Sequence, residues 1–290
     1  MNDELAIGDR LFSSWSLRAW QLFAKFNIPV RVRQAGLYSP AIPELLTEFA
    51  PSRTVPSARL DGDLVWDSLA LAETLAERHP DADLWPKDRK TRAFARSVTA
   101  EMHSGFLALR KACAMDVRRS YPKFEASDEV NADVARIEKL WDASREFALK
   151  GPWLFGAYSI ADAFYAPIAM RFATYGLGQS NFTKRYVQTH LTDPDFRRWR
   201  AMGFAENHQL TVYDLDQPVG PWPGPKIKQA TAVQGQSSQN NVCPYSGKPV
   251  THVLEMNNIR WGFCNAFCRD KTVADPEAWP EFMMMVDGKQ

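Results

Sequence analysis

Hydrophobic and polar positions in the first eighty residues switch between strand-like and helix-like patterns. Short apolar or alternating runs predict strands, and apolar residues that recur every three to four positions predict helices. An Asp-Gly pair between two short apolar runs predicts a tight hairpin. The expected elements are a strand at Leu5–Ile7, a helix ending near Asn27, an edge strand at Val30–Gln34, a short helix at Pro43–Phe49, a hairpin through Asp61 and Gly62, and a helix at Leu69–Arg78. This order predicts an α/β domain over residues 1–82.

The next stretch, residues 87–212, has a wholly helical pattern and predicts a second, all-α domain. The expected helices are Thr91–Arg119, interrupted only by Gly105, then Asn131–Ala148, Ile160–Tyr175 and finally Asp195–Asn207. Ile160–Tyr175 is apolar nearly all round, so we expect it in the middle of a helical bundle. Ser159 and Asp162 precede this apolar run with the spacing of a capping box.

Composition changes again after the helical domain. Residues 213–241 are rich in Pro, Gly, Gln and Ser, which is typical of a linker that is extended at first and flexible later. Residues 242–290 contain three of the four cysteines and several aromatic residues. A segment of about fifty residues rarely buries enough core to fold alone. We therefore expect a small cysteine-containing appendage that is held by a metal, a disulfide or docking.

The overall composition and charge of the chain exclude several classes of function. The chain has 290 residues, of which 45% are hydrophobic and 24% charged, as in soluble globular proteins. Its net charge of +1 predicts neither a nucleic-acid nor a membrane partner. No stretch has the length of a transmembrane helix, and Met1–Arg10 lacks the apolar core of a signal peptide. Because Cys113 stands alone and the other cysteines follow residue 240, we expect no disulfide framework, reduced thiols and a cytoplasmic location.

Candidate chemistry begins at Phe12–Trp20, which reads Phe-Ser-Ser-Trp-Ser-Leu-Arg-Ala-Trp and joins the first strand to the first helix. Serines at such a junction are good N-caps, because a hydroxyl oxygen accepts hydrogen bonds from the free amides of the first turn. The same amides and the helix dipole also favour an anion, including a thiolate. The local pattern leaves both interpretations open.

Four motifs in the same order resemble the glutathione S-transferase superfamily over roughly residues 4–212. Ser-Ser-Trp-Ser-Leu-Arg resembles the serine-type active site of zeta-like and related bacterial members. Val55-Pro56 resembles the cis-proline turn that leads into the third strand, and Asp67-Ser68 resembles the family's acidic-Ser pair. Tyr158–Pro167 resembles the folding motif of the helical domain. The resemblance implies a thioredoxin-like N-terminal domain followed by an all-α helical-bundle domain.

This resemblance also implies roles for individual residues. The catalytic serine is Ser13, with Ser14 as the near alternative and Ser16 as a cap or support. The serine hydroxyl donates a hydrogen bond to the sulfur of glutathione and favours the thiolate. Arg18 either adds positive potential near the sulfur or is a solvated surface arginine.

Two further motifs are expected to bind glutathione itself. The backbone of Val55, ahead of Pro56, would pair with the cysteinyl part of the tripeptide. Asp67 and Ser68 would receive its γ-glutamyl end, although both would also cap a helix without any ligand.

Together these roles imply a glutathione transferase or glutathione-dependent isomerase that acts on an electrophilic small molecule. The family resemblance also implies a homodimer, and a second-substrate pocket between the two domains. The linker and the tail leave an alternative open, a non-catalytic glutathione S-transferase-fold binding or regulatory protein with a metal-sensing or partner-docking tail.

Cysteine placement argues against thiol–disulfide exchange at the first helix, because residues 1–112 contain no cysteine. Cys113 is expected to be an inert buried thiol. Cys243-Pro-Tyr-Ser resembles the redox motifs of thioredoxin-like proteins, which open a helix. Here Gly247 and Pro249 follow at once, so we expect no helix at this position.

The tail resembles the small cysteine-containing YHS or TRASH-type metal-associated modules over about residues 242–283. Ser246 stands where such modules often have a further cysteine. The remaining candidates for a tetrahedral zinc site are Cys243, Cys264, Cys268 and His252. The alternative is that the tail docks through its aromatic residues and that its cysteines only pack.

Overall fold

The structure is a computed structural model that describes residues 3–148, 150–235 and 237–288. The described residues therefore leave out the outermost residues of the predicted first and last domains. They also leave out residue 149 of the predicted helical domain and residue 236 of the predicted linker. The chain divides into two compact units. Unit 1 comprises Met1–Leu191 and Leu210–Pro223, and unit 2 comprises Thr192–Gln209 and Gly224–Gln290.

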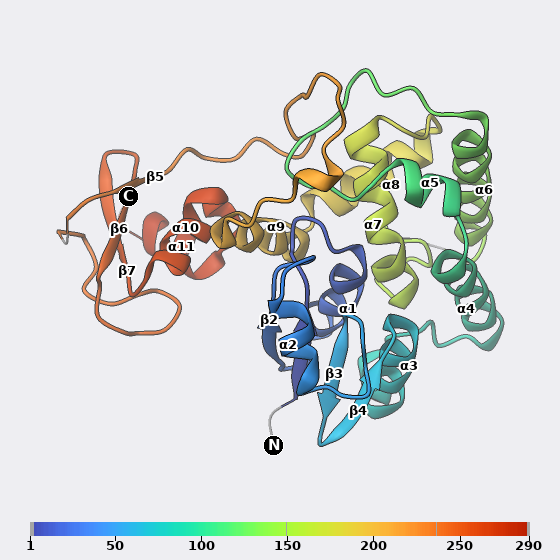
Figure 1. Cartoon of the computed structure of the whole chain (residues 1–290), viewed down its shortest axis with the longest axis horizontal. Helices are drawn as coiled ribbons and strands as arrows, with labels where there is room; N and C mark the ends of the chain where they lie inside the picture. The colour runs from blue at the N-terminus through green and yellow to red at the C-terminus, as the bar shows by residue number, and fades with distance from the viewer. Residues whose placement is uncertain (1–2, 149, 236, 289–290) are drawn as a thin grey trace. The chain divides into compact units, whose positions relative to one another are not determined.

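Unit 1 begins with a four-stranded sheet of order β2-β1-β3-β4 (Figure 1). Strands β1 and β2 pair in parallel, and β3 pairs antiparallel with both β1 and β4. The elements are β1 (Glu4–Ile7), α1 (Ser14–Lys25), β2 (Arg31–Gln34), α2 (Ala41–Thr47), β3 (Ser57–Leu60), β4 (Asp63–Trp66) and α3 (Ser68–Arg78). The predicted α/β order and the position of β2 at the sheet edge are confirmed.

Local chemistry explains these elements. The side chains of Leu5 and Ile7 on β1 are completely buried, and the apolar face of α1 is buried too. At the hairpin, Asp61 and Gly62 both have positive φ, 51° and 103°, as a two-residue turn between β3 and β4 requires. Because β1 and β2 are parallel, α1 must cross over between them, and this places its N-terminus at the carboxyl end of β1.

The rest of unit 1 is mainly helical, with α4 (Arg89–Ser104), α5 (Leu107–Ala112), α6 (Asp128–Arg145), α7 (Ile160–Tyr175), α8 (Asn181–Thr192) and a short 3-10 helix at Thr211–Tyr213. Helix α7 is buried almost all round, as its apolar pattern predicts, and it contacts both α1 and α4. Ser159 and Asp162 form the predicted capping box. Trp141 of α6 packs against Tyr165 and Phe172 of α7 and completes this core.

One predicted helix is too long, and one helix was not predicted. The expected helix at Thr91–Arg119 breaks at Gly105 and at Phe106, which has φ 60°, and helical structure ends at Ala112. The chain then turns because the carboxylate of Asp116 accepts hydrogen bonds from the backbone N–H and the guanidinium of Arg118. Helix α8 is not singled out by the pattern of hydrophobic positions.

Unit 2 combines α9 (Pro194–Glu206) with a three-stranded antiparallel sheet of order β5-β6-β7 and two more helices. Its other elements are β5 (Thr231–Val233), β6 (His252–Met256), β7 (Ile259–Phe263), α10 (Ala266–Ala274), a 3-10 helix at Pro276–Ala278 and α11 (Pro280–Asp287). Leu254, Trp261 and Phe282 form its apolar core together with Ala201 of α9. An ion pair of 2.6 Å between Arg197 of α9 and Asp275 also joins these parts.

The predicted linker at residues 213–241 is more ordered than its composition suggests. Near its start, Asp214 pairs with Arg118 at 2.6 Å, and Gly220 exchanges backbone hydrogen bonds with Ser120. Further on, Thr231–Val233 forms β5, because these β-prone residues extend the sheet at the edge of β6.

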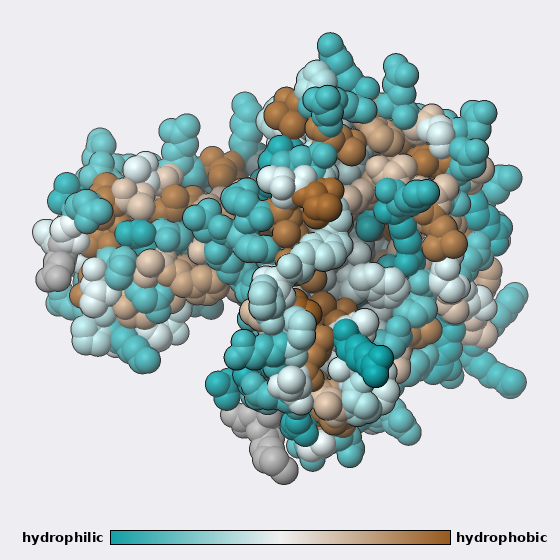
Figure 2. Space-filling model, viewed as in Figure 1, coloured by the Kyte–Doolittle hydropathy of each residue, from teal (hydrophilic) through white to brown (hydrophobic). Residues whose placement is uncertain are grey.

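Surface hydropathy agrees with the amphipathic helices of unit 1. Figure 2 shows mostly hydrophilic side chains over α4 and α6, whose buried residues lie on the opposite, core-facing stripe. Among the helices of the described chain, none is both long and apolar enough to span a membrane.

Candidate functional site

A cavity of about 690 Å³ in unit 1 lies at the N-terminus of α1. Its lining includes the predicted residues Ser13, Ser14 and Val55. The other lining residues are Phe12, Trp15, Leu37, Tyr38, Ser39, Ile42, Pro43, Thr54, Arg110, Ala114, Met115, Arg171 and Tyr213. A second hollow of about 730 Å³ lies at α3 and α4 and has mainly charged walls, but none of the predicted site residues line it.

Hydrogen bonds distinguish the three serines. Ser13 is the N-cap of α1, since its Oγ accepts from the backbone N–H of Ser16 at 3.3 Å. The Ser13 hydroxyl also donates to Ser16 Oγ at 2.8 Å, and Ser16 Oγ accepts from the backbone N–H of Gly8 at 2.9 Å. Ser16 therefore supports the turn, as expected. Ser14 lines the cavity, and its hydroxyl has no hydrogen-bond partner among the residues that the structure describes.

The turn before β3 contributes the second predicted element. The Val55–Pro56 peptide bond is cis, as the motif predicts. Val55 lines the cavity, whereas Pro56 is buried and is not among the lining residues. The backbone carbonyl of Thr54 accepts hydrogen bonds from the hydroxyls of Ser52 and Ser57, at 3.2 and 2.7 Å. These bonds hold the backbone of the turn in place at the cavity wall.

Asp67 and Ser68 lie at the start of α3 and are not among the residues that line the cavity. Asp67 has φ 71°, and one carboxylate oxygen accepts from the N–H of Leu69 at 2.7 Å, so the expected helix cap is present. Its other oxygen lies 3.3 Å from Nε2 of His103. The hydroxyl of Ser68 is buried and, within the described chain, has no hydrogen-bond partner. The pair thus offers one carboxylate and one unused hydroxyl beside α4.

Arg18 lies inside the protein, so the interpretation as a solvated surface arginine is wrong. Only 1% of it is exposed. Its guanidinium carbon lies 4.4 Å from the centre of the Trp15 ring and 5.2 Å from that of Phe164. Burial lowers the pKa of Arg18, with further lowering from Arg110 and Arg171, while Asp67 opposes the shift. Arg18 therefore adds positive charge behind Trp15, away from the cavity lining.

Two arginines of the cavity wall were missed by sequence reasoning. Arg110 follows the break between α4 and α5, and its guanidinium lies 5.2 Å from the Trp15 ring centre. Arg171 lies in the apolar helix α7, and burial lowers its pKa to about 10, so it stays charged at neutral pH. A basic residue inside a largely apolar helix was the available signal for Arg171. No carboxylate lines this cavity, so its wall is positively charged.

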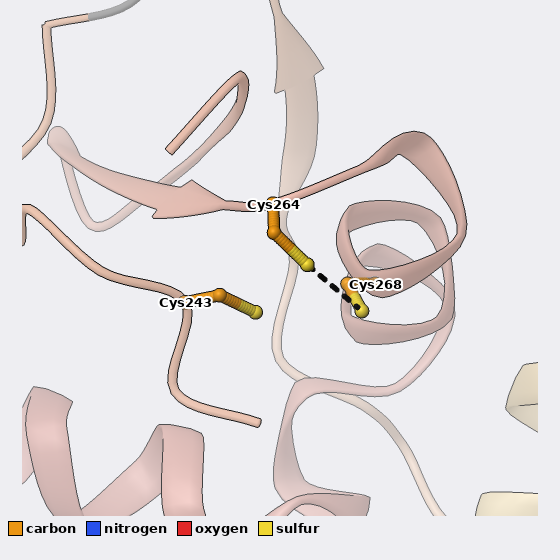
Figure 3. A group of neighbouring side chains, drawn as sticks. All are labelled: Cys243, Cys264 and Cys268. Carbon is orange, nitrogen blue, oxygen red and sulfur yellow. Dashed lines mark hydrogen bonds between the residues drawn. The ribbon is translucent and has the colours of Figure 1, made fainter. Parts of the chain in front are cut away.

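The three cysteines of unit 2 form a second candidate site (Figure 3). Cys243 lies in a loop, Cys264 directly follows β7, and Cys268 is in the first turn of α10, which brings their Sγ atoms within 4.8 Å of one another. The Sγ atoms of Cys264 and Cys268 are 3.9 Å apart. As expected, the Cys243-Pro-Tyr-Ser segment forms a turn and does not open a helix.

Electrostatics around the cysteines favour one thiolate. Burial raises the pKa of Cys243, but hydrogen bonds from the backbone of Cys264, Tyr245 and Ser246 and from the Ser246 side chain outweigh it and lower the pKa to about 7. Burial and the charge on Cys243 raise the pKa of Cys268 to about 12. The hydrogen bonds to Cys243 therefore favour its thiolate over that of Cys268.

His252 is not part of the cysteine cluster, so the proposed Cys3His set is wrong in its fourth member. His252 begins β6, and its Nδ1 lies 2.9 Å from the hydroxyl of Thr251. It lines a different hollow together with Arg269. Cys113, by contrast, is fully buried in unit 1, and burial raises its pKa to about 12, as expected for an inert thiol.

Known proteins resemble part of this chain. Residues 12–78 match the family model of the glutathione S-transferase N-terminal domain. A probable maleylacetoacetate isomerase of Caenorhabditis elegans is 35% identical over 103 residues, which are 34% of this chain and 48% of the relative. A maleylacetoacetate isomerase of Dictyostelium discoideum is 40% identical over 52 residues, 18% of this chain and 24% of the relative. The chain thus spans about half or less of the curated relatives it matches.

Solved structures extend the likeness to the fold. A glutathione transferase homologue from Burkholderia, solved with bound glutathione, has a TM-score of 0.53 at 23% identity and covers 70% of this chain and 98% of its own. Glutathione transferase Omega 3C of Trametes versicolor has a TM-score of 0.52 at 18% identity and covers 68% of this chain and 87% of its own. At these identities the similarity shows the fold alone, so the chemistry must be inferred from the residues of the site.

Proposed function

We propose that this chain binds glutathione and activates its thiol, because residues 12–78 match the family model of the glutathione S-transferase N-terminal domain and the chain has the thioredoxin-like and helical fold of a glutathione transferase homologue. The thiolate then attacks an electrophilic small molecule, in a conjugation or an isomerisation. The observation that carries the proposal is one cavity, about 690 Å³ in volume, that combines the serines at the N-terminus of α1 with the backbone before cis-Pro56. Helix amides and a hydroxyl at this point stabilise a thiolate.

We assign thiolate stabilisation to Ser14 in preference to Ser13. The Ser13 hydroxyl already bonds to Ser16 in two ways and closes the first turn of α1. Ser14 lines the cavity and its hydroxyl has no hydrogen-bond partner among the described residues, so it can donate to a ligand sulfur without breaking the cap. Val55 would pair with the cysteinyl backbone of glutathione, and Asp67 and Ser68 would receive its γ-glutamyl end.

A carboxylate-bearing electrophile suits the positively charged side of the cavity. Arg110 and Arg171 supply two cations, and no acidic residue of the lining opposes them. Two relatives are named maleylacetoacetate isomerases, and reversible addition of a thiolate to a conjugated double bond allows such a bond to change from cis to trans. The thiolate adds, the resulting single bond rotates, and elimination releases both the product and glutathione.

Calorimetric titration with reduced glutathione tests the binding step. We expect wild-type protein to bind and the Asp67→Ala, Ser68→Ala double variant to bind much more weakly. Turnover of an unsaturated oxo-acid and of a neutral electrophile, each measured with and without glutathione, tests the chemistry. Binding without turnover of any electrophile would favour the alternative function, a non-catalytic binding protein of the same fold. A homodimer in the cytoplasm remains our expectation, and sedimentation of the purified protein measures the assembly.

Metal binding by unit 2 is a second proposed function. It depends on the cysteine cluster, whose 3.9 Å separation between the sulfurs of Cys264 and Cys268 suits thiolates around one ion. Sulfurs bound tetrahedrally to zinc at about 2.3 Å lie about 3.8 Å apart. With Cys243 the set supplies three thiolates, and the resemblance of residues 242–283 to metal-associated modules supports the same interpretation.

Metal analysis of the purified full chain tests this second function. We expect one zinc ion per chain in the wild type and none in a Cys264→Ser, Cys268→Ser variant. Cys113→Ser is the matched control, because that buried thiol lies in unit 1 outside the cluster. Folded wild-type protein that takes up no zinc would reject the site.

A further inference from the structure

We propose that Lys271 is a built-in counter-cation for the cysteine cluster, so that the cluster and Lys271 together form a site for a thiophilic divalent ion. This inference rests on the proposed metal-binding function and adds a positioning residue to it. Lys271 is not a ligand, because it acts through its charge on the sulfur atoms that bind the ion.

The first observation is the burial of a lysine without a carboxylate partner. Lys271 is 8% exposed, although lysine is rarely buried unless it is paired. Within residues 3–148, 150–235 and 237–288, no carboxylate forms an ion pair with it. Its Nζ instead lies 3.8 Å from the ring centre of Tyr245 and 3.7 Å from that of Trp279. The two rings hold the ammonium group in place.

The second observation is what else faces this ammonium group. Cys268 precedes Lys271 by three residues on α10, so both side chains lie on neighbouring positions of one helix face. Cys268 and Cys243 both interact electrostatically with the lysine, as do Glu281 of α11 and, unfavourably, Arg198 of α9. Negative charge on these two sulfurs, once an ion has displaced their protons, would therefore help to compensate this buried cation.

The summed charge of the three thiolates and Lys271 indicates which kind of ion the cluster would bind. Three thiolates carry −3, and Lys271 brings the sum to −2, which a divalent cation neutralises. A neutral assembly is favoured in a half-buried place, since an uncompensated charge away from water is costly. Thiolates in turn select a soft or borderline ion such as Zn²⁺ over Mg²⁺ or Ca²⁺.

Lys271 also has a mechanical link to Cys243. Tyr245 lies two residues after Cys243, and its hydroxyl is 2.5 Å from the hydroxyl of Thr272 on α10. Lys271 packs on the ring of the same tyrosine, so it helps to hold the Cys243 loop against α10. A useful experiment must therefore separate the charge of Lys271 from its packing.

Measuring the zinc affinity of full-length variants separates the effect of the Lys271 charge from the effect of its packing. Lys271→Met keeps an unbranched side chain between the two rings but removes the charge, and Lys271→Arg keeps the charge. Competition with a chromophoric chelator measures Zn²⁺ binding, and circular dichroism of the metal-free proteins measures folding. We expect Lys271→Met to weaken Zn²⁺ binding by about 10- to 100-fold, as loss of an outer-shell partner does, and Lys271→Arg to recover most of it.

Each other result overturns the inference in a distinguishable way. Equal affinity of Lys271→Met and wild type removes the role of Lys271 and leaves the metal site standing. Equal weakening in Lys271→Met and Lys271→Arg, with both folded, shows that packing and not charge matters. If Lys271→Met and Lys271→Gln both fail to fold without metal while the arginine variant folds, Lys271 is a structural cation. Wild type that binds no Zn²⁺ rejects the metal function as well.

Discussion

Among the described residues that line the cavity at the α1 N-terminus, Ser14 carries the one hydroxyl outside the capping network, and replacing Ser14 with alanine removes it. Ser13 and Ser16 keep their hydrogen bonds of 2.8 and 3.3 Å with each other, so the helix cap remains. A hydrogen bond to a charged group contributes about 1.5–3 kcal/mol. This corresponds to about one to two pKa units of the bound glutathione thiol. We therefore expect Ser14→Ala to raise that pKa by about one to two units with little change in stability.

Ultraviolet absorbance of the thiolate, followed from pH 5 to 10 on the saturated complex, gives this pKa directly. The wild-type thiol pKa is lowered by the hydroxyl, so the variant should lose turnover at neutral pH and regain it as pH rises through the higher pKa. At neutral pH we expect turnover to fall by about 10- to 100-fold, which is the same free energy expressed as a rate.

Ser13→Ala is the matched control for this prediction. It removes the N-cap of α1 and should lower the free energy of unfolding by about 1 kcal/mol, while it changes the thiol pKa less than Ser14→Ala does. The opposite pattern, with an unchanged thiol pKa in Ser14→Ala and a raised one in Ser13→Ala, would refute the assignment and return the catalytic role to Ser13. An unchanged pKa in both variants would leave helix amides as the whole source of activation.

Three further predictions concern unit 1. In steady-state assays, Arg110→Met should raise KM for a carboxylate-bearing electrophile by at least about tenfold, which is the equivalent of one lost charged hydrogen bond. KM for a neutral electrophile should stay nearly unchanged. Burial lowers the pKa of His190 to about 3 from an ordinary 6.5, so folding favours its neutral form. The free energy of unfolding should therefore fall by about 1.4 kcal/mol per pH unit as pH drops from 6.5 toward 3. Urea unfolding of His190→Phe should lack this slope. Asp162→Ala leaves the buried N–H of Leu154 and the hydroxyl of Tyr186 without their acceptor, so denaturant unfolding should show a loss of about 3–5 kcal/mol.

Contrary results would be informative in each case. Equal effects of Arg110→Met on charged and neutral electrophiles would mean that Arg110 shapes the pocket, since it also bonds to the backbone carbonyl of His103. An unchanged acid slope in His190→Phe would show that other groups dominate the pH dependence. A small loss in Asp162→Ala would mean that other groups or water take over its hydrogen bonds.

The elements of unit 1 were largely predictable because local rules and tertiary structure agree there. Asp61 and Gly62 suit a tight turn in any context, and Ser159 with Asp162 caps a helix through bonds within four residues. Helix Ile160–Tyr175 was placed correctly in the core because an all-apolar helix has no face to offer to water. Boundaries failed where a side chain competed with the helix, as Asp116 does after Ala112.

The candidate site was only partly predictable, for a related reason. Ser13, Ser14 and Val55 lie within short motifs whose geometry is local, and they do meet at one cavity. Arg110 and Arg171 are 61 positions apart in the numbering, and only the packing of α5 and α7 brings both to the cavity wall. His252 was assigned to the cysteine cluster by composition, but its position on β6 takes it to a different hollow.

What the sequence determined by itself was most elements of residues 1–82, the turn at Asp61–Gly62 and the cap at Ser159–Asp162, and the candidate chemistry at Phe12–Trp20, all of which depend on neighbours a few residues away. Tertiary structure alone decided which of those candidates share a cavity and that Arg18 is buried next to Trp15. It also decided that Cys243 meets Cys264 and Cys268, which follow 21 and 25 positions later, while His252 does not join them. The reason is physical. Hydrogen-bonding and dihedral preferences act over one turn, whereas burial and charge depend on which distant segments exclude water together.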